Sequence, residues 1–347
     1  MSDTAAHLVD HVFPHVAVRQ WVLTLPIPLR YRIAFDHKLE SAVLALFLAT
    51  IFAWLRAKAK EDGILNPRPG AVTIIQRAGG SLNLAPHFHA LVLDGVFSRP
   101  GPESPHVFHA TLEPTDGDIA DILLTVRLRV RRLLERRGLV GGQAGDVPDP
   151  LREEAPLLAA CYGASVQGTL ALGPRAGHYL SRVRSDAAPA PSVVARARCA
   201  RLDGYSLHAD VRVSGHDRKR LEHLCRYIAR PPLALERLHQ RPDGRLLYQL
   251  RRPWSDGTKS ILFEPLDFMA KLAALVPHPR GHSRPLSRSS RAPRRLASRP
   301  RPQPAGAEHA PAHQLQHRHP PTRFPPVGGA SRPHLRPGRP DLLPLRR

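Results

Sequence analysis

Two histidines separated by one residue, His87 and His89, lie in an apolar segment whose composition predicts a β-strand. Alternate side chains of a strand point to the same face, so both imidazoles could reach one cation while Phe88 points to the other face. The chain has 20 histidines among 347 residues, so a His-x-His pair is expected about once by chance. A second pair, His317 and His319, occurs in a polar context. The pattern alone leaves both a metal site and a coincidence open.

A second candidate is Tyr227, which lies in a segment with helical periodicity. Arg220, His223 and Arg230 precede or follow it by seven, four and three residues, so all three would share its helix face. A phenol is a weak nucleophile at neutral pH, but nearby cations and a metal-polarised phosphodiester would assist its attack on phosphorus. The same residues also fit a surface tyrosine beside a solvated basic helix.

The elements that position these residues follow from hydrophobic periodicity. Alternation predicts strands, and apolar residues at three- and four-residue steps predict amphipathic helices. The histidine pair would lie on the second strand of an antiparallel hairpin, and Tyr227 on a helix that ends before Pro231. The predicted strands are 18–25, 71–76, 87–93, 207–213, 246–250 and 260–263, and the predicted helices are 36–60, 119–137, 214–230 and 266–276.

The charge of the chain indicates a polyanionic partner. Lysine and arginine number 51 against 29 acidic residues, a net charge of +22 at pH 7, and nucleic acid is the first polyanion to consider. Residues 276–347 hold 15 arginines, two acidic residues and 16 of the 37 prolines, a composition that predicts a disordered tail. In the rest of the chain, Arg30, Arg32 and the arginines of 119–137 either follow a DNA backbone or solvate exposed faces.

The sequence gives no indication of an exported or membrane-bound protein. Its three cysteines are too scattered for a disulfide framework or a CxxC zinc site. The longest apolar run, residues 42–55, is too short to span a bilayer, and the first 20 residues lack a signal-peptide pattern. We therefore expect a cytoplasmic protein without a membrane partner.

Five sequence blocks resemble a known family. They are RQWVLTLPIPLRYRIAFD, GAVTIIQRAGGSLNLAPHFHALVLDGVF, GYSLHADVRV, LEHLCRYIARPPLALERL and PWSDGTKSILFEPLDFMAKLAALVP. In this order they resemble rolling-circle transposases of the insertion sequence 91 family, which belong to the HUH nuclease superfamily. The similarity extends from about residue 4 to residue 276 and includes the histidine pair and Tyr227.

The resemblance implies an α+β fold with an antiparallel sheet, flanking helices and the metal-binding histidines on a central strand. It assigns binding of Mg or Mn, a divalent cation, to His87 and His89, and nucleophilic attack to Tyr227. In such enzymes the metal polarises the scissile phosphate of single-stranded DNA at transposon ends. The tyrosine then forms a 5'-phosphotyrosine and releases a 3'-hydroxyl during DNA transposition. No small-molecule cofactor is implied, and the protein would associate with the bacterial nucleoid when bound to DNA.

Some site assignments remain open under this resemblance. The superfamily usually adds a third polar metal ligand, for which Gln76 is the first candidate and His208 the second. Strand register, which would decide between them, cannot be read from the sequence. The arginines around the tyrosine, Arg220, Arg226 and Arg230, are the expected DNA contacts.

The chain also departs from the family pattern. Members with two catalytic tyrosines carry the first at the position of His223, so this chain is a one-tyrosine version. Family members begin with a cysteine-rich zinc module and continue as folded sequence beyond residue 277. We therefore expect 1–17 to be a remnant linker, 18–275 the catalytic domain and 276–347 a tail produced by a frameshift near Arg280.

Two further functional hypotheses compete with an active transposase. The first is a catalytically defective remnant that only binds DNA, which the missing modules would explain. The second is a basic, non-enzymatic RNA- or DNA-binding protein, which would explain the charge but not the ordered blocks.

Overall fold

The computed structural model describes residues 2–99, 101, 103–111, 113–140, 148–184 and 197–277. The chain divides into two units, residues 1–282 and 283–347. The second unit, and with it almost all of the predicted disordered tail, lies outside the described residues. All elements below belong to the first unit.

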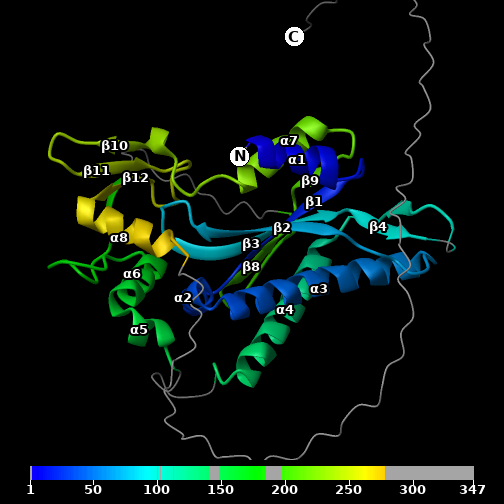
Figure 1. The fold of residues 1–347 in the computed structure, drawn as a ribbon, viewed down its shortest axis with the longest axis horizontal. Coiled ribbons are helices and arrows are strands. Elements are labelled where there is room, and N and C mark those ends of the chain that lie inside the picture. Colours follow the sequence, from blue (N-terminus) through cyan, green and yellow to red (C-terminus); the bar gives the residue numbers. More distant parts are fainter. Residues whose placement is uncertain are drawn as a thin grey trace, which may run out of the picture. The chain divides into compact units, whose positions relative to one another are not determined.

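The centre of the first unit is an antiparallel sheet in the strand order β2-β3-β1-β8-β7, with the short β9 beside β1 (Figure 1). The predicted histidine-bearing hairpin is confirmed, because β2 pairs antiparallel with β3. The strands are β1 (Val18–Thr24), β2 (Ala71–Ala78), β3 (Leu84–Leu93), β7 (Cys199–Leu202), β8 (Tyr205–His208) and β9 (Arg212–Val213).

The strand predicted over 207–213 is divided into β8 and β9, which pair with different parts of β1. The backbone between β8 and β9 binds a buried arginine. The Arg19 guanidinium donates 3.0 Å to the carbonyl of Ala209 and also binds both carboxylate oxygens of Asp94, at 2.9 and 3.0 Å. Arg212 donates to the same carboxylate at 2.7 Å. The break therefore provides hydrogen-bond partners for a charge that would be costly to bury alone.

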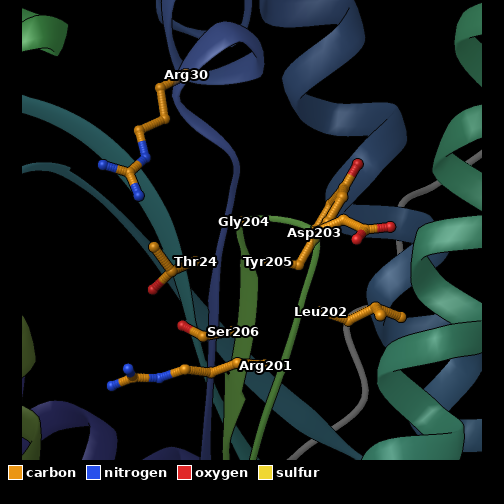
Figure 2. A pocket seen from close by; sticks show the side chains of 8 residues that line it. All are labelled: Thr24, Arg30, Arg201, Leu202, Asp203, Gly204, Tyr205 and Ser206. Atoms are coloured by element: carbon orange, nitrogen blue, oxygen red, sulfur yellow. The ribbon is translucent and has the colours of Figure 1, made fainter.

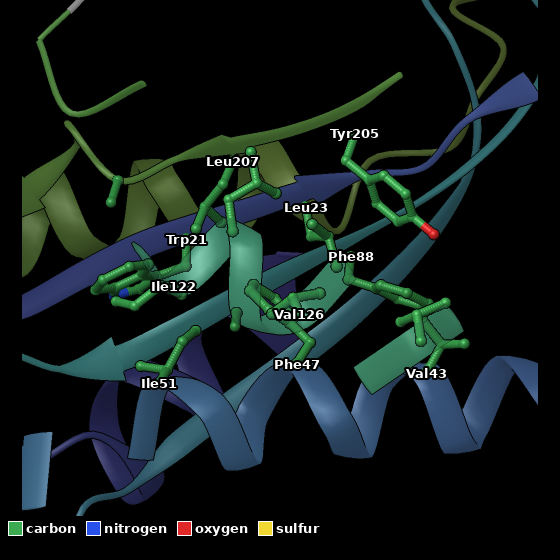
Figure 3. Close-up of a cluster of buried hydrophobic side chains, with 14 of the residues drawn as sticks. Trp21, Leu23, Val43, Phe47, Ile51, Phe88, Ile122, Val126, Tyr205 and Leu207 are labelled. Atoms are coloured by element: carbon green, nitrogen blue, oxygen red, sulfur yellow. The ribbon is translucent and has the colours of Figure 1, made fainter. Parts of the chain in front are cut away.

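Two long helices, α3 (His37–Glu61) and α4 (Asp116–Arg136), cover one face of the central sheet. Phe47 of α3, Val126 of α4 and the sheet residues Trp21, Phe88 and Leu207 meet in the main hydrophobic core (Figure 3). Phe88 is fully buried, a burial that contributes about 1.5–3 kcal/mol to stability. Phe88 therefore anchors the strand from the face opposite its two histidine neighbours.

Helix α3 has 25 residues and is long and apolar enough to cross a membrane by length and composition, which corrects the expectation drawn from residues 42–55. In the structure its apolar stripe, including Val43, Phe47 and Ile51, is buried against the sheet and α4. Core packing therefore accounts for its composition.

The opposite face of the sheet carries α7 (Arg218–Ile228), packed with the N-terminal helices α1 (Ser2–His7) and a π-helix (Leu8–Val12). Arg218 of α7 donates to the backbone carbonyls of Val9, Phe13 and Pro14. The segment interpreted as a linker thus holds α7 in place. Asp217 caps α7 by accepting from the Arg220 amide at 3.0 Å, so the helix begins a few residues after the predicted start at residue 214.

A second antiparallel sheet follows the order β10-β11-β12-β6 and has its own hydrophobic core. The strands predicted over 246–250 and 260–263 are confirmed as β11 and β12, which pair antiparallel. The strands are β6 (Ser181–Arg184), β10 (Leu238–Gln240), β11 (Leu246–Gln249) and β12 (Thr258–Phe263).

The remaining elements are α2 (Ile27–Phe35), α5 (Pro150–Glu154), α6 (Pro156–Gln167), α8 (Pro265–Leu275), a 3-10 helix (Leu235–Arg237) and the hairpin β4 (Gly95–Ser98) and β5 (Val107–Ala110). The fold is therefore α+β with antiparallel sheets, as expected.

Candidate metal and nucleophile site

The register of the central sheet places five side chains in one row across five strands. Gln76 of β2 pairs with His87 of β3, His87 pairs with Thr24 of β1, and Thr24 pairs with Ser206 of β8. Ser206 pairs in turn with Arg201 of β7. Directly paired residues in an antiparallel sheet point to the same face. The row therefore lies on the polar face of the sheet, opposite the core around Phe88.

His87 and His89 point to this same face, and their ring centroids lie 4.9 Å apart. The His87 Nδ1–H donates 2.7 Å to the carbonyl of Ala85, which leaves the lone pair on Nε2. The Gln20 amide nitrogen lies 2.8 Å from Nδ1 of His89. If the side-chain amide of Gln20 is flipped, its oxygen takes the place of the nitrogen and accepts from the Nδ1–H of His89. The lone pair of His89 is then on Nε2.

His89 Nε2 is buried and has no hydrogen-bond partner among the described residues. A buried polar nitrogen without a partner costs about 1–3 kcal/mol, and a cation at this atom would offset that cost. The donor set is suitable, because imidazole nitrogens are common ligands of divalent metals. The residues present therefore fit the implied metal on structural grounds.

Burial favours the neutral form of both rings. Desolvation lowers the pKa of His87, and the charge of nearby Arg30 lowers it further, although the hydrogen bond to Ala85 opposes both effects. Desolvation, with a smaller contribution from His87, lowers the pKa of His89 to about 3. Metal ligation requires neutral imidazole, so both rings are in the ligating form at neutral pH.

The two candidates for a third ligand have different positions. Gln76 lies directly across from His87, and its amide nitrogen donates 2.5 Å to the carbonyl of Ile228. The amide oxygen is left available on the polar face. His208 pairs with Val22, which itself pairs with His89, so two strand spacings, about 10 Å between Cα atoms, separate His208 from His89. No cluster of three His, Cys, Asp or Glu forms within the described ranges.

Tyr227 lies at the C-terminal end of α7 and is 42% exposed. The guanidinium carbons of Arg230 and Arg251 lie 4.3 and 4.9 Å from the centre of its ring. Arg230 was expected here. Arg251 was missed, because it comes from the loop after β11 and no local spacing relates it to Tyr227. Two cations therefore flank the phenol.

The other two predicted DNA-contacting arginines differ in whether an acidic residue pairs with them. Arg220 is exposed near the start of α7. Arg226 is exposed too, but it forms a 2.5 Å ion pair with Glu222 one turn earlier. The pairing leaves less of the Arg226 charge for a phosphate than the exposed Arg220 offers.

The surroundings of the other five tyrosines make them poorer nucleophile candidates. Tyr162 and Tyr248 are fully buried, and Tyr205 is buried in the main core (Figure 3). Tyr31 donates its hydroxyl to Asp149 at 2.8 Å, and burial raises its pKa. Tyr179 is exposed, but it precedes β6 of the second sheet. Tyr227 alone combines exposure with a position beside the histidine-bearing sheet.

The chain matches the sequence profile Y2_Tnp, described as "Putative transposase", over residues 70–284. The match covers well over half of the chain and includes His87, His89 and Tyr227. The chain therefore belongs to this transposase family. No curated protein and no solved structure matches the chain. Transposases act on DNA, so the strong positive charge agrees with the family.

Proposed function

We propose that this transposase nicks and rejoins single-stranded DNA through a 5'-phosphotyrosine at Tyr227, with Mg²⁺ or Mn²⁺ held by His87, His89 and Gln76. The observation that carries the proposal is the position of Gln76. It pairs with His87 in the sheet and hydrogen-bonds to the residue after Tyr227. One side chain thus joins the histidine-bearing strands to the helix that carries the phenol.

The chain's own residues would perform most of the reaction. The imidazoles of His87 and His89 would hold the divalent cation. Arg230 and Arg251 hold the Tyr227 ring and offer positive charge to an incoming phosphate. A divalent cation, when bound, would polarise the scissile phosphate. The phenol oxygen forms a bond to phosphorus as the bond from phosphorus to the 3'-oxygen breaks. The phenol proton leaves to solvent, and the departing oxygen takes up a proton.

Rejoining is the reverse of this step. A 3'-hydroxyl attacks the phosphotyrosine, its proton is lost, and Tyr227 recovers its hydroxyl. One phosphodiester is exchanged for one phosphotyrosine and back, so the cycle needs no external energy source. His223, exposed one helical turn before Tyr227, cannot form a second phosphotyrosine. Each site would therefore handle one strand end at a time.

The proposal is tested with single strands that carry the two ends of the DNA element encoding the chain. Labelled strands are incubated with the full chain and Mn²⁺, and covalent protein–DNA adducts are separated under denaturing conditions. We expect an adduct that is lost in EDTA and in Tyr227→Phe. Tyr179→Phe is the matched control and should retain it. A folded wild-type protein that binds these strands without forming an adduct would favour a DNA-binding remnant instead.

A further inference from the structure

A pocket of about 350 Å³ opens beside the histidine pair, where the end of β1, the β7–β8 turn and α2 come together (Figure 2). Its polar lining includes Thr24, Ser206, Arg201 and Arg30. Thr24, Ser206 and Arg201 continue the row that contains Gln76 and His87. The pocket is therefore an extension of the candidate site along the same face of the sheet.

The turn that forms one wall is tightly defined. Asp203 and Gly204 both have positive φ, +48° and +80°, which is typical of a two-residue type I' hairpin turn. A Cβ added at Gly204 would lie 3.1 Å from Cβ of Pro26, at the entry to α2. The turn therefore packs closely on the segment that leads to Arg30, and the pocket needs no rearrangement to form.

The side chains of the pocket divide by chemistry. Figure 2 shows Arg30, Thr24, Ser206 and Arg201 extending to one side of the β7–β8 hairpin, while Asp203 extends to the other. Asp203 forms a 2.5 Å ion pair with Arg127 of α4, so its negative charge is already balanced. The polar side of the pocket thus presents two guanidiniums with two hydroxyls between them.

Neither guanidinium has a carboxylate partner within the part of the chain that the structure describes. Arg30 is half-buried, and its Nε donates 2.6 Å to the carbonyl of Leu25. This hydrogen bond fixes the group and leaves its terminal nitrogens available. Arg201 is exposed at the rim. A half-buried cation without a counterion loses hydration that an anionic ligand would replace.

We propose that this pocket binds a backbone phosphate close to the scissile phosphate in the same DNA strand. Arg30 and Arg201 would bind it together with the hydroxyls of Thr24 and Ser206. The position of this phosphate along the DNA, near the scissile phosphate, rests on the proposed function. Ser206 is two strand spacings from His87, about 10 Å. At the duplex rise of roughly 3.4 Å per nucleotide, this distance corresponds to about three nucleotides at most. The phosphate would therefore be a near neighbour of the one cleaved.

A phosphate suits the pocket better than a base does. Guanidinium groups bind phosphate oxygens with paired, charge-assisted hydrogen bonds, and hydroxyls donate to the remaining oxygens. Tyr205 is directed into the main core and offers no stacking face, whereas base recognition in single strands relies on stacking on aromatic rings. The contact would therefore be independent of sequence.

The test measures binding of a fluorescent oligothymidine to the full chain in EDTA, so that neither metal nor cleavage contributes. Arg201→Gln is the main variant, because Arg201 is exposed and its side chain forms no ion pair or hydrogen bond within the described residues, and Arg30→Gln is the second. We expect each to weaken binding about five- to tenfold and to reduce the slope of log K against log salt by about 0.7. Arg56→Gln removes the same charge from α3, on the opposite side of the sheet, and should change binding less than twofold.

A second strand of the same length with an uncharged methylphosphonate backbone identifies the group that is recognised. Arg201→Gln should bind this strand as well as the wild type does. An equal loss of affinity for both strands would overturn the phosphate assignment. So would Arg201→Gln and Arg30→Gln variants that bind oligothymidine as tightly as Arg56→Gln.

The same variants separate this inference from the proposed function. If no phosphotyrosine adduct forms but Arg201→Gln still weakens binding of the charged strand, the phosphate site stands and the nuclease proposal fails. If the adduct forms and the pocket variants bind normally, the nuclease proposal stands and the pocket assignment fails.

Discussion

The side-chain amide of Gln76 reaches from β2 to the backbone carbonyl of Ile228 in α7, a hydrogen bond of 2.5 Å between residues 152 positions apart. Gln76 is also the direct cross-strand neighbour of His87, and Ile228 follows Tyr227. The hydrogen bond therefore sets the position of the tyrosine backbone relative to the histidine strand. The amide nitrogen of Gln76 makes the connection to α7, and its amide oxygen is the atom proposed above as a metal ligand.

Replacing Gln76 tests both parts of this relationship. Gln76→Leu removes the amide oxygen and the hydrogen bond to Ile228 while keeping most of the side-chain volume. We expect Mn²⁺ affinity to fall at least about tenfold, as for loss of a metal ligand or its support, and adduct formation to fall with it. Calorimetric titration with Mn²⁺ measures the affinity. Gln240→Leu on the exposed β10 is the control, and unchanged Mn²⁺ affinity in Gln76→Leu would exclude Gln76 as a ligand.

Metal binding should stabilise the folded chain. At a Mn²⁺ concentration 100 times the dissociation constant, the expected gain is about 2.7 kcal/mol, observed as a rise in melting temperature. His89→Leu should remove this gain. It also leaves the buried Gln20 amide without its partner at Nδ1, which lowers the stability of the metal-free protein, so the readout is the difference in melting temperature with and without Mn²⁺. His239→Leu, at an exposed position of β10, should retain the gain. A His89→Leu variant that Mn²⁺ stabilises as much as the wild type would contradict the site.

The two arginines on the Tyr227 ring should affect the rate of adduct formation. An exposed cation–π contact is worth about 0.5–1 kcal/mol, so Arg251→Gln and Arg230→Gln should each slow the reaction by about two- to fivefold at saturating DNA. Arg226→Gln should have a smaller effect, because Glu222 already balances that charge. Single-turnover measurements of adduct formation would compare the rates of these variants. A larger effect of Arg226→Gln than of Arg251→Gln would contradict the prediction.

A buried lysine gives the second core a pH-dependent stability. Lys271 of α8 is 3% exposed and its ammonium has no hydrogen-bond partner in the described residues. Desolvation lowers its pKa to about 8, although Asp267 and Cys161 oppose the shift. Below pH 8 the lysine is protonated in both states, and the folded state carries the full cost of the buried charge. Between about pH 8 and 10.4 the folded state releases its proton first, so the free energy of unfolding rises with pH.

Lys271→Met should therefore stabilise the protein at pH 7, by about 3 kcal/mol at most, and this advantage should diminish as the pH approaches 10. Denaturant unfolding at several pH values measures it. Lys259→Met, at an exposed position of β12, is the matched control and should show no such trend. An advantage of Lys271→Met that grows between pH 8 and 10 would contradict the account.

Local patterns predicted the elements that carry the site but not the way they meet. The alternation around His87 and the periodicity around Tyr227 were sufficient to place these residues on β3 and α7. The register that aligns Gln76 with His87 depends on long-range pairing, which local periodicity does not contain. Arg251 beside Tyr227 is a contact of the same kind.

Two elements of the fold were not predicted from the sequence, for different reasons. The β7–β8 hairpin has a local signal, because Asp203 and Gly204 form a dipeptide typical of type I' turns, and this signal was overlooked. Helix α6 packs against α2 and α8, but its exposed positions, such as Leu157 and Ala160, are apolar as well. It therefore lacks the amphipathic periodicity by which helices are recognised.

Mass-spectrometric mapping of the covalent adduct tests the central claim most directly. The full chain is incubated with Mn²⁺ and single strands of the element ends, then digested with nuclease and protease. The account predicts a nucleotide linked through its 5'-phosphate to a single peptide, with the phosphate on Tyr227. An adduct that maps to another tyrosine, or that persists in Tyr227→Phe, would contradict it.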